Sequence, residues 1–191
     1  MGVKILAFAG ALRTGSFNKK LVKVAAEGAR KAGAEVTYVD LKDYSLPVFD
    51  EDLERAESLP ANGRKLKDLF LAHDALLISA PEYNSSISAV LKNTIDWVSR
   101  PAPNEKPLGC FDGKVAGLMS ASPGALGGLR GLVTVRSILA NIKVIVLPEQ
   151  LAVMKSHEAF NEDGTLKDAK QQASAEGIGR RVAEVTAKLK G

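Results

Sequence analysis

Residues 10–18 form a loop of small and polar residues that carries the side chains best suited to bind an anion. The loop follows an apolar run at residues 3–9 and precedes a helical pattern, so it lies between a strand and a helix. Backbone N–H groups at a helix N-terminus favour negative charge, while Arg13, Ser16 and Asn18 add a permanent cation and neutral donors. We therefore expect a phosphate site here, although Ser16 or Asn18 could equally be the N-cap of an ordinary helix.

The glycine spacing of this loop argues against two nucleotide-binding motifs. A Walker A loop has a lysine directly after its second glycine, and Ser16 occupies that position after Gly15. A dinucleotide fingerprint has two glycines separated by one residue, which the run from Gly10 to Gly15 lacks. A single terminal phosphate therefore fits the loop better than a triphosphate or a pyrophosphate.

Two further polar segments follow apolar runs. The first consists of Pro81, Glu82, Tyr83 and Asn84. It offers a flat amphipathic ring and groups that can hydrogen-bond the edge of a heterocycle, but taken alone it is equally consistent with a surface turn. The second runs over residues 120–130 and includes Ser120 and Gly124; its glycines permit close approach of a ligand to backbone N–H groups.

Apolar runs alternate with helical patterns along the chain. The apolar runs lie at residues 3–9, 34–41, 75–80, 114–120 and 143–147, and the helical patterns at residues 17–31, 62–72, 88–98, 126–140 and 166–189. Such alternation is typical of a parallel sheet with helices on both faces. We expect one domain over residues 1–191: a three-layer α/β/α sandwich with a five-stranded parallel sheet of order 2-1-3-4-5.

Residues 42–60 show no clear period, and residues 47–50 are expected to form a loop that is able to overhang the ligand site. In the expected strand order, the carboxyl ends of the first and third strands lie at the switch point where ligands bind. The three polar segments then surround one cleft. A mononucleotide with a large planar ring satisfies all three, and flavin mononucleotide (FMN) is the simplest candidate.

The composition argues against several other classes of site and partner. The chain has 26 basic and 22 acidic residues, a net charge of +4, and one basic cluster on the first helical pattern that is typical of a solvated face. We expect no nucleic-acid partner. A single cysteine, Cys110, and two histidines, His73 and His157, can form neither an internal disulfide nor a zinc centre by themselves, so no metal site is expected.

No apolar run approaches the roughly 20 residues that span a bilayer, and the N-terminus lacks the pattern of a secretory leader. We expect no membrane partner. A lone cysteine is consistent with a reducing compartment, so a cytoplasmic location is expected.

Four motifs, in this order and spacing, resemble the NAD(P)H-dependent FMN reductase family, and in particular its bacterial quinone and chromate reductases. They are Gly10-Ala-Leu-Arg13-x-x-Ser16-x-Asn18, Pro81-Glu-Tyr-Asn84, Leu91-Lys-Asn93-x-Ile-Asp-Trp97 and the turn from Ser120 to Gly128. The resemblance implies a flavodoxin-like fold. It also implies electron transfer from NADPH or NADH, through bound FMN, to a small-molecule acceptor: a quinone, free flavin, chromate or another metal oxyanion.

The resemblance further implies roles for single residues. Arg13, Ser16, Phe17 and Asn18 would hold the FMN phosphate; Pro81, Glu82, Tyr83 and Asn84 the isoalloxazine; Ser120 and Gly124 its pyrimidine side. No catalytic side chain is assigned, because hydride transfer takes place at flavin N5. Alternate binding of NAD(P)H and acceptor at one face predicts ping-pong kinetics.

Members of the family are dimers and tetramers, so a homodimer or homotetramer is expected, with Arg100 and Glu149 as candidates for subunit contacts. The chain departs from the family pattern at Ala11, where a serine is common, and at Ser88 and Ala89, where Pro-Gly is common. Trp97 is expected to be a packing residue.

The main alternative is a flavodoxin-like electron carrier that does not oxidise NAD(P)H itself. Such carriers are usually acidic and have a Thr/Ser-rich phosphate loop, whereas this chain is basic and has Arg13 in the loop. A nucleotide-binding regulatory or structural module is a third alternative. Oxidation of NAD(P)H would distinguish the enzyme from both.

Overall fold

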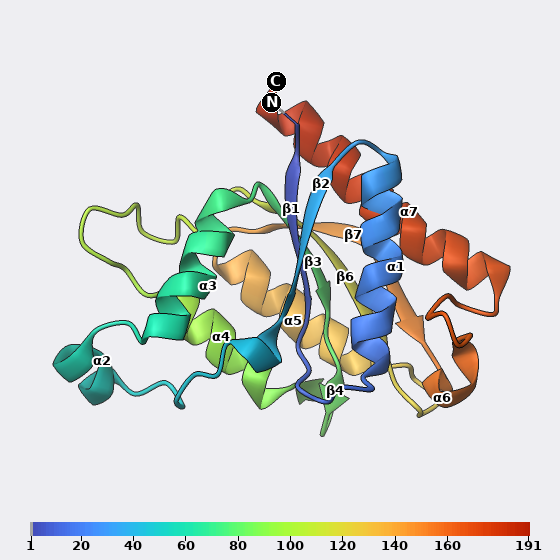
Figure 1. The fold of residues 1–191 in the computed structure, drawn as a ribbon, viewed down its shortest axis with the longest axis horizontal. Helices are drawn as coiled ribbons and strands as arrows, with labels where there is room; N and C mark the ends of the chain where they lie inside the picture. Colours follow the sequence, from blue (N-terminus) through green and yellow to red (C-terminus); the bar gives the residue numbers. More distant parts are fainter. Residues whose placement is uncertain (1) are drawn as a thin grey trace.

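A five-stranded parallel sheet forms the centre of the computed structural model, which describes residues 2–191 (Figure 1). Its strands are β1 (Lys4–Ala9), β2 (Glu35–Asp40), β3 (Ala75–Ser79), β6 (Val115–Ala121) and β7 (Ile145–Val153). They lie in the order β2-β1-β3-β6-β7, and each neighbouring pair is parallel. Because β4 and β5 form a separate hairpin, this is the predicted order 2-1-3-4-5, and the predicted fold class is confirmed.

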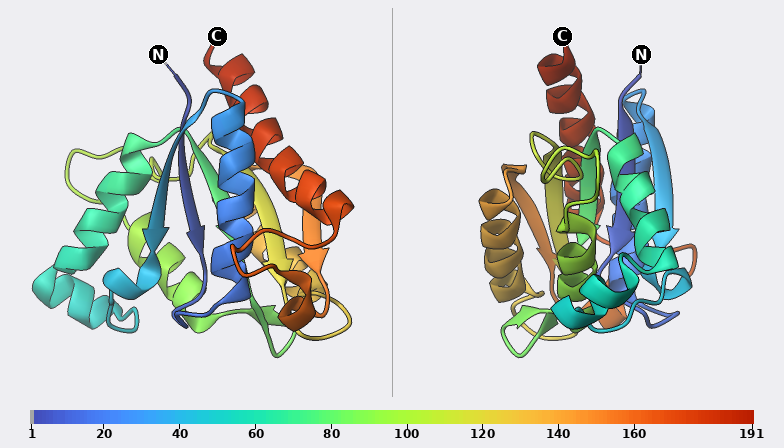
Figure 2. Two further views of the ribbon diagram at one scale, coloured as in Figure 1. Left: turned by 45° about the vertical axis from the view of Figure 1, so that its right-hand side comes forward. Right: turned by 90° about the vertical axis from the view of Figure 1, so that its left-hand side faces the viewer.

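Helices cover both faces of the sheet (Figure 2). They are α1 (Phe17–Lys31) and α7 (Ala169–Lys190) on one face, and α3 (Ala61–Ala72), α4 (Ala89–Ser99) and α5 (Leu129–Asn141) on the other. Alternate residues of β1 point to opposite layers: Ile5 and Ala7 pack with α1 and α7, while Leu6 and Phe8 pack with the other three helices. This two-sided burial explains why β1 is apolar at almost every position.

The crossing of α1 and α7 depends on two glycines. A Cβ atom at Gly28 would lie 2.0 Å from the Glu176 carbonyl oxygen, and one at Gly179 would lie 1.8 Å from the Ala25 carbonyl oxygen. No side chain fits at these distances, so glycine is what allows the two backbones to approach so closely.

Several short elements were not predicted. They are the 3₁₀ helix η1 (Leu41–Asp43), α2 (Glu51–Glu57), the hairpin strands β4 (Glu82–Tyr83) and β5 (Ser86–Ile87), and α6 (Ser156–Ala159). No helix was predicted where α2 lies; residues 47–50, predicted to form a loop, precede α2 and are neither helix nor strand. The side chain of Asp50 caps α2, but no residue of the helix is buried, so no apolar period marks it.

Strand β7 is longer than the predicted run at residues 143–147. Its pairing with β6 shifts register, because Val146 pairs with Ala116 while Gln150 pairs with Leu118. The intervening Pro148 and Glu149 are exposed at this edge of the sheet, and they interrupt the apolar pattern on which the prediction depended.

Residues 2–191 show neither a membrane-spanning helix nor a metal-ligand cluster. No described helix is both long and apolar enough to cross a membrane. The same residues contain no group of three or more His, Cys, Asp or Glu side chains placed to hold a metal ion.

Candidate functional site

The loop between β1 and α1 presents a free cation beside free backbone donors. Ser16 is the N-cap of α1, but its side chain makes no capping hydrogen bond. Among residues 2–191, no acceptor faces the N–H groups of Phe17 and Asn18. The Arg13 guanidinium is exposed, lies over the Phe17 ring and has no carboxylate within ion-pair distance in the described chain. An anion would satisfy both the helix end and the guanidinium.

Asn18 joins this loop to two strand ends. Its Oδ1 accepts hydrogen bonds from Ser79 Oγ at 2.8 Å and from Ala121 N at 3.0 Å, and its Nδ2 donates to Ala121 O at 2.8 Å. The side chain is almost fully buried. Asn18 therefore shapes the loop with its side chain and can offer an anion its backbone N–H.

Ser88 joins the same loop to α4. Its hydroxyl donates to Gly10 O at 2.6 Å and accepts from Leu91 N at 3.3 Å, so it is both an interloop contact and the N-cap of α4. A Cβ at Gly10 would lie only 2.8 Å from Leu91 Cβ, so the loop packs closely against this helix. Ser88 is one of the two residues that replace the usual Pro-Gly, and it fixes this part of the site.

The segment after β3 is a hairpin. Its two turn residues, Asn84 and Ser85, have φ angles of 50° and 66°, which is the pattern of a type I′ turn. Tyr83 beside the turn is 64% exposed. The hairpin thus presents an exposed aromatic ring beside the polar segments.

Glu82 has a partner that its sequence context does not suggest. Its carboxylate accepts hydrogen bonds from the backbone N–H groups of Arg130 and Gly131 at 3.0 and 3.3 Å, and it pairs with the Arg130 guanidinium at 2.6 Å. Burial raises the pKa of Glu82, but the bonds from Arg130 and Gly131 outweigh that effect and hold the pKa below its usual value. The carboxylate accepts hydrogen bonds from the first turn of α5 and so links the hairpin to the third segment, residues 120–130.

The third segment contains an unpartnered buried hydroxyl. Ser120, near the carboxyl end of β6, is fully buried, and its Oγ has no hydrogen-bond partner within residues 2–191. Gly127 and Gly128 have φ angles of 61° and 92°, and a Cβ at Gly128 would lie 1.9 Å from Ser120 Oγ. By contrast, the space around Gly124 is open. Ser120 therefore has an unsatisfied buried hydroxyl directly beneath the glycine-rich turn.

The fourth motif holds residues 44–57 against α4. Trp97 Nε1 and Asn93 Nδ2 both donate to Pro47 O, at 2.9 and 2.8 Å, and Asn93 Oδ1 accepts from Phe49 N at 2.8 Å. Trp97 is fully buried, which confirms its predicted packing role. A mostly apolar cavity of about 330 Å³ lies between this segment, the residues near Leu12 and the start of α4.

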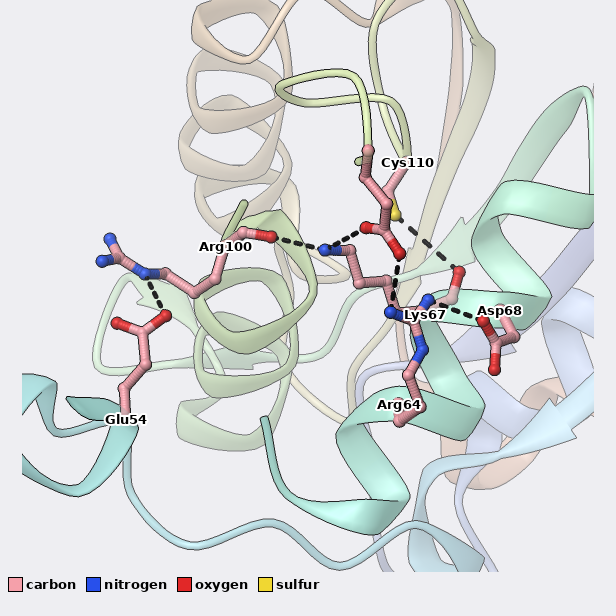
Figure 3. Close-up of polar contacts among 7 residues, drawn as sticks. Glu54, Arg64, Lys67, Asp68, Arg100 and Cys110 are labelled. Atoms are coloured by element: carbon pink, nitrogen blue, oxygen red, sulfur yellow. Dashed lines mark hydrogen bonds and ion pairs between the residues drawn. The ribbon is translucent and has the colours of Figure 1, made fainter. Parts of the chain in front are cut away.

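An ionic network supports the other end of α4 (Figure 3). Lys67 donates to Arg100 O at 2.6 Å and pairs with Glu105 at 2.5 Å, while Arg64 pairs with Glu105 at 2.7 Å. The Arg100 side chain pairs with Glu54 of α2 at 2.8 Å. The bond from Lys67 lowers the pKa of Glu105. This network stabilises α2 and residues 101–110 and does not include the three polar segments.

The hydrogen bonds described above bring the three polar segments to one edge of the sheet, near the β4 label in Figure 1. The model of the family described as NADPH-dependent FMN reductase matches residues 3–158. The chain belongs to this family.

Relatives of the FMN reductase agree with the assignment. An NAD(P)H-dependent FMN reductase of Pseudomonas aeruginosa is 34% identical over 169 residues, which are 88% of this chain and 86% of the relative. An NAD(P)H:quinone oxidoreductase of Solanum tuberosum is 32% identical over 194 residues, 99% of this chain and 95% of the relative. The solved structure of FerB, an NAD(P)H:(acceptor) oxidoreductase of Paracoccus denitrificans, superposes with a TM-score of 0.82 at 27% identity, covering 97% of this chain and 98% of FerB.

Family membership confirms the resemblance read from the sequence. The protein is an NAD(P)H-dependent FMN reductase, with FMN as its cofactor and NAD(P)H as its electron donor. The resemblance assigns Asn18 and Glu82 to the flavin, but in the structure their side chains bond to other protein groups, Ser79 and Arg130.

Proposed function

We propose that FMN binds across the three segments and that quinones are the electron acceptors. The observation that carries this assignment is the unpaired Arg13 guanidinium beside the free N–H groups at the start of α1. Arg13, Ser16 and the backbone of Phe17 and Asn18 would hold the phosphate. When bound, FMN accepts a hydride from NAD(P)H and passes two electrons to the acceptor.

The ring site would lie between the hairpin and the glycine-rich turn. Pro81, Glu82 and Asn84 would meet the ring mainly through their backbone, since the Glu82 carboxylate is engaged by Arg130. Ser120 and Gly124 would lie on the pyrimidine side, where Ser120 Oγ lacks a protein partner. The exposed Tyr83 ring offers an apolar surface next to the cleft for an aromatic substrate.

Quinones are the acceptor class that the similar proteins favour, since relatives from Solanum tuberosum and Pseudomonas putida are named quinone reductases. Chromate and other metal oxyanions are further acceptors to be tested with the same assay. We also propose a single domain over residues 1–191, a homodimer or homotetramer, and a cytoplasmic location; the mass of the purified protein in solution tests the second of these.

A comparison of FMN with riboflavin, which lacks the phosphate, tests the phosphate site. Arg13→Gln removes the guanidinium and its charge but keeps a shorter polar side chain. We expect FMN to bind about 10 to 100 times more weakly to this variant, the loss of one or two charge-assisted hydrogen bonds, while riboflavin binding changes less than twofold. Lys23→Gln in α1 is the control, since Lys23 lies against Tyr38 and away from the loop. Equal loss of both flavins would place the phosphate elsewhere.

A further inference from the structure

An aromatic pair connects the phosphate loop to the segment that follows β7. The rings of Phe17 and Phe160 are stacked, with centroids 5.9 Å apart and an interplanar angle of 13°. The Arg13 guanidinium carbon lies 5.3 Å from the centroid of the Phe17 ring. The three side chains therefore form a column that ends at the cation of the ligand loop.

Phe160 is held in place by its own local structure. It is 9% exposed and belongs to the core shared by α1 and α7. It pairs with Leu166 in an antiparallel bridge, and the turn between them is closed by a hydrogen bond from Asn161 N to Thr165 O at 2.8 Å. Phe17, by contrast, is only half-buried. Phe160 is thus the fixed member of the pair and supports the ring on which Arg13 lies.

Arg13 needs support of this kind because no carboxylate within residues 2–191 holds its exposed side chain. A long flexible side chain loses rotamer freedom when it is ordered, and that loss weakens binding unless the side chain is ordered in advance. A guanidinium stacks favourably on an aromatic face, so the column keeps Arg13 beside the N-terminus of α1.

We propose that Phe160 is a positioning residue for the FMN phosphate, acting through Phe17 on Arg13. This inference rests on the phosphate site proposed above. Phe160 lies outside residues 3–158, the part of the chain that the family model matches. It makes no contact with the ligand in this account; it reduces the ordering that Arg13 must undergo when phosphate binds.

The test compares FMN and riboflavin dissociation constants for Phe160→Leu, measured by quenching of flavin fluorescence. We expect FMN to bind more weakly by up to threefold to fivefold, roughly the full strength of the exposed Arg13–Phe17 contact that Phe160 supports, with riboflavin binding unchanged within the error. Phe160→Tyr keeps the ring and should retain the FMN preference. If Phe160→Leu fails to fold, Phe160→Met provides the same comparison.

Phe111→Leu is the matched control for loss of a core phenylalanine, because Phe111 is fully buried on the other face of the sheet, against Phe70. It should lower the melting temperature without changing the ratio of the two dissociation constants. In an Arg13→Gln background, Phe160→Leu should have no further effect on that ratio, because the residue through which it acts is absent.

The outcomes separate the two proposals. If Arg13→Gln lowers the preference for FMN and Phe160→Leu does not, the role of Phe160 is overturned while the phosphate site stands. If Phe160→Leu has the same effect with and without Arg13, its role is general packing and the inference is overturned. If neither variant changes the ratio, the phosphate site itself is wrong.

Discussion

At the scale of single residues, the site is held together by side chains whose partners lie far away in the sequence. Ser88 bonds to Gly10, Asn18 to Ala121, and Glu82 to Arg130. Asn18 and Glu82 belong to motifs that the resemblance assigns to the flavin. Their observed contacts instead position the backbone, so the N–H groups of the loops are the more direct candidates for ligand contact.

Replacing Ser88 by alanine removes both the α4 cap and the bond to Gly10 O. We expect the free energy of unfolding to fall by about 1–2 kcal/mol, the usual cost of losing a cap with a buried acceptor left unpaired. Urea denaturation measures this change. Ser99→Ala at the other end of the same helix is the control: Ser99 Oγ donates only to Asp96 O, three residues earlier in the same helix, and a change below about 0.5 kcal/mol is expected. Equal losses would contradict the assigned role of Ser88.

Glu82→Gln should lower stability at neutral pH by about 1–3 kcal/mol, because a charge-assisted contact with Arg130 and two backbone N–H groups is weakened. The pKa of Glu82 is lower in the folded protein than the unfolded value of about 4.3. The carboxylate therefore contributes stability above that unfolded value, and the contribution is lost as the pH falls through the folded pKa. The difference between wild type and Glu82→Gln should shrink from pH 7 to pH 3; a constant difference would show that the ion pair contributes nothing.

At the scale of elements, the close crossing of α1 and α7 supports the face of the sheet behind the phosphate loop. It requires two residues without side chains, since the backbone oxygens of Ala25 and Glu176 occupy the places of the missing Cβ atoms at Gly179 and Gly28. The crossing holds α1 in its C-terminal half, at Ala25 and Gly28, and so fixes the helix whose N-terminal N–H groups face the proposed phosphate.

Gly179→Ala should force the two helices apart and lower the free energy of unfolding by about 1–3 kcal/mol, the usual cost of overpacking. Gly177→Ala is a matched control two residues away in the same helix, where the nearest atom to the new Cβ is the flexible end of Arg180 at 3.9 Å. There the better helix propensity of alanine should stabilise the protein by about 0.5–1 kcal/mol. Thermal unfolding of the two variants tests the crossing. If both variants lose stability to the same extent, the loss is not specific to the close approach at Gly179.

At the scale of the whole molecule, much of the architecture could be predicted from the sequence. The sheet order followed from five apolar runs alternating with helical patterns. The bounds of α1 were predicted at both ends. Ser16 occupies the N-cap position at its start, and Gly33, with a φ of 86°, follows its end. Local signals were sufficient wherever an element had a buried face.

The rest depends on contacts that no local pattern records. Helix α2 buries nothing, and β7 continues through Pro148, so neither gives the expected periodicity. In the candidate site, the three segments and their convergence were predicted, but the engagement of the Glu82 carboxylate by Arg130 was not, because it joins residues 48 positions apart. Phe160 belongs to none of the four motifs. Its stacking on Phe17 joins residues far apart in the sequence, so no local pattern predicts it.

We have proposed that this fold holds FMN and passes electrons from NAD(P)H to a quinone. The most direct test is the visible absorption spectrum of the FMN-loaded, desalted protein under air-free conditions. We predict that NADPH or NADH bleaches the bound flavin and that a quinone added afterwards restores its colour. Retained flavin that neither nucleotide reduces would contradict the account and indicate an electron carrier.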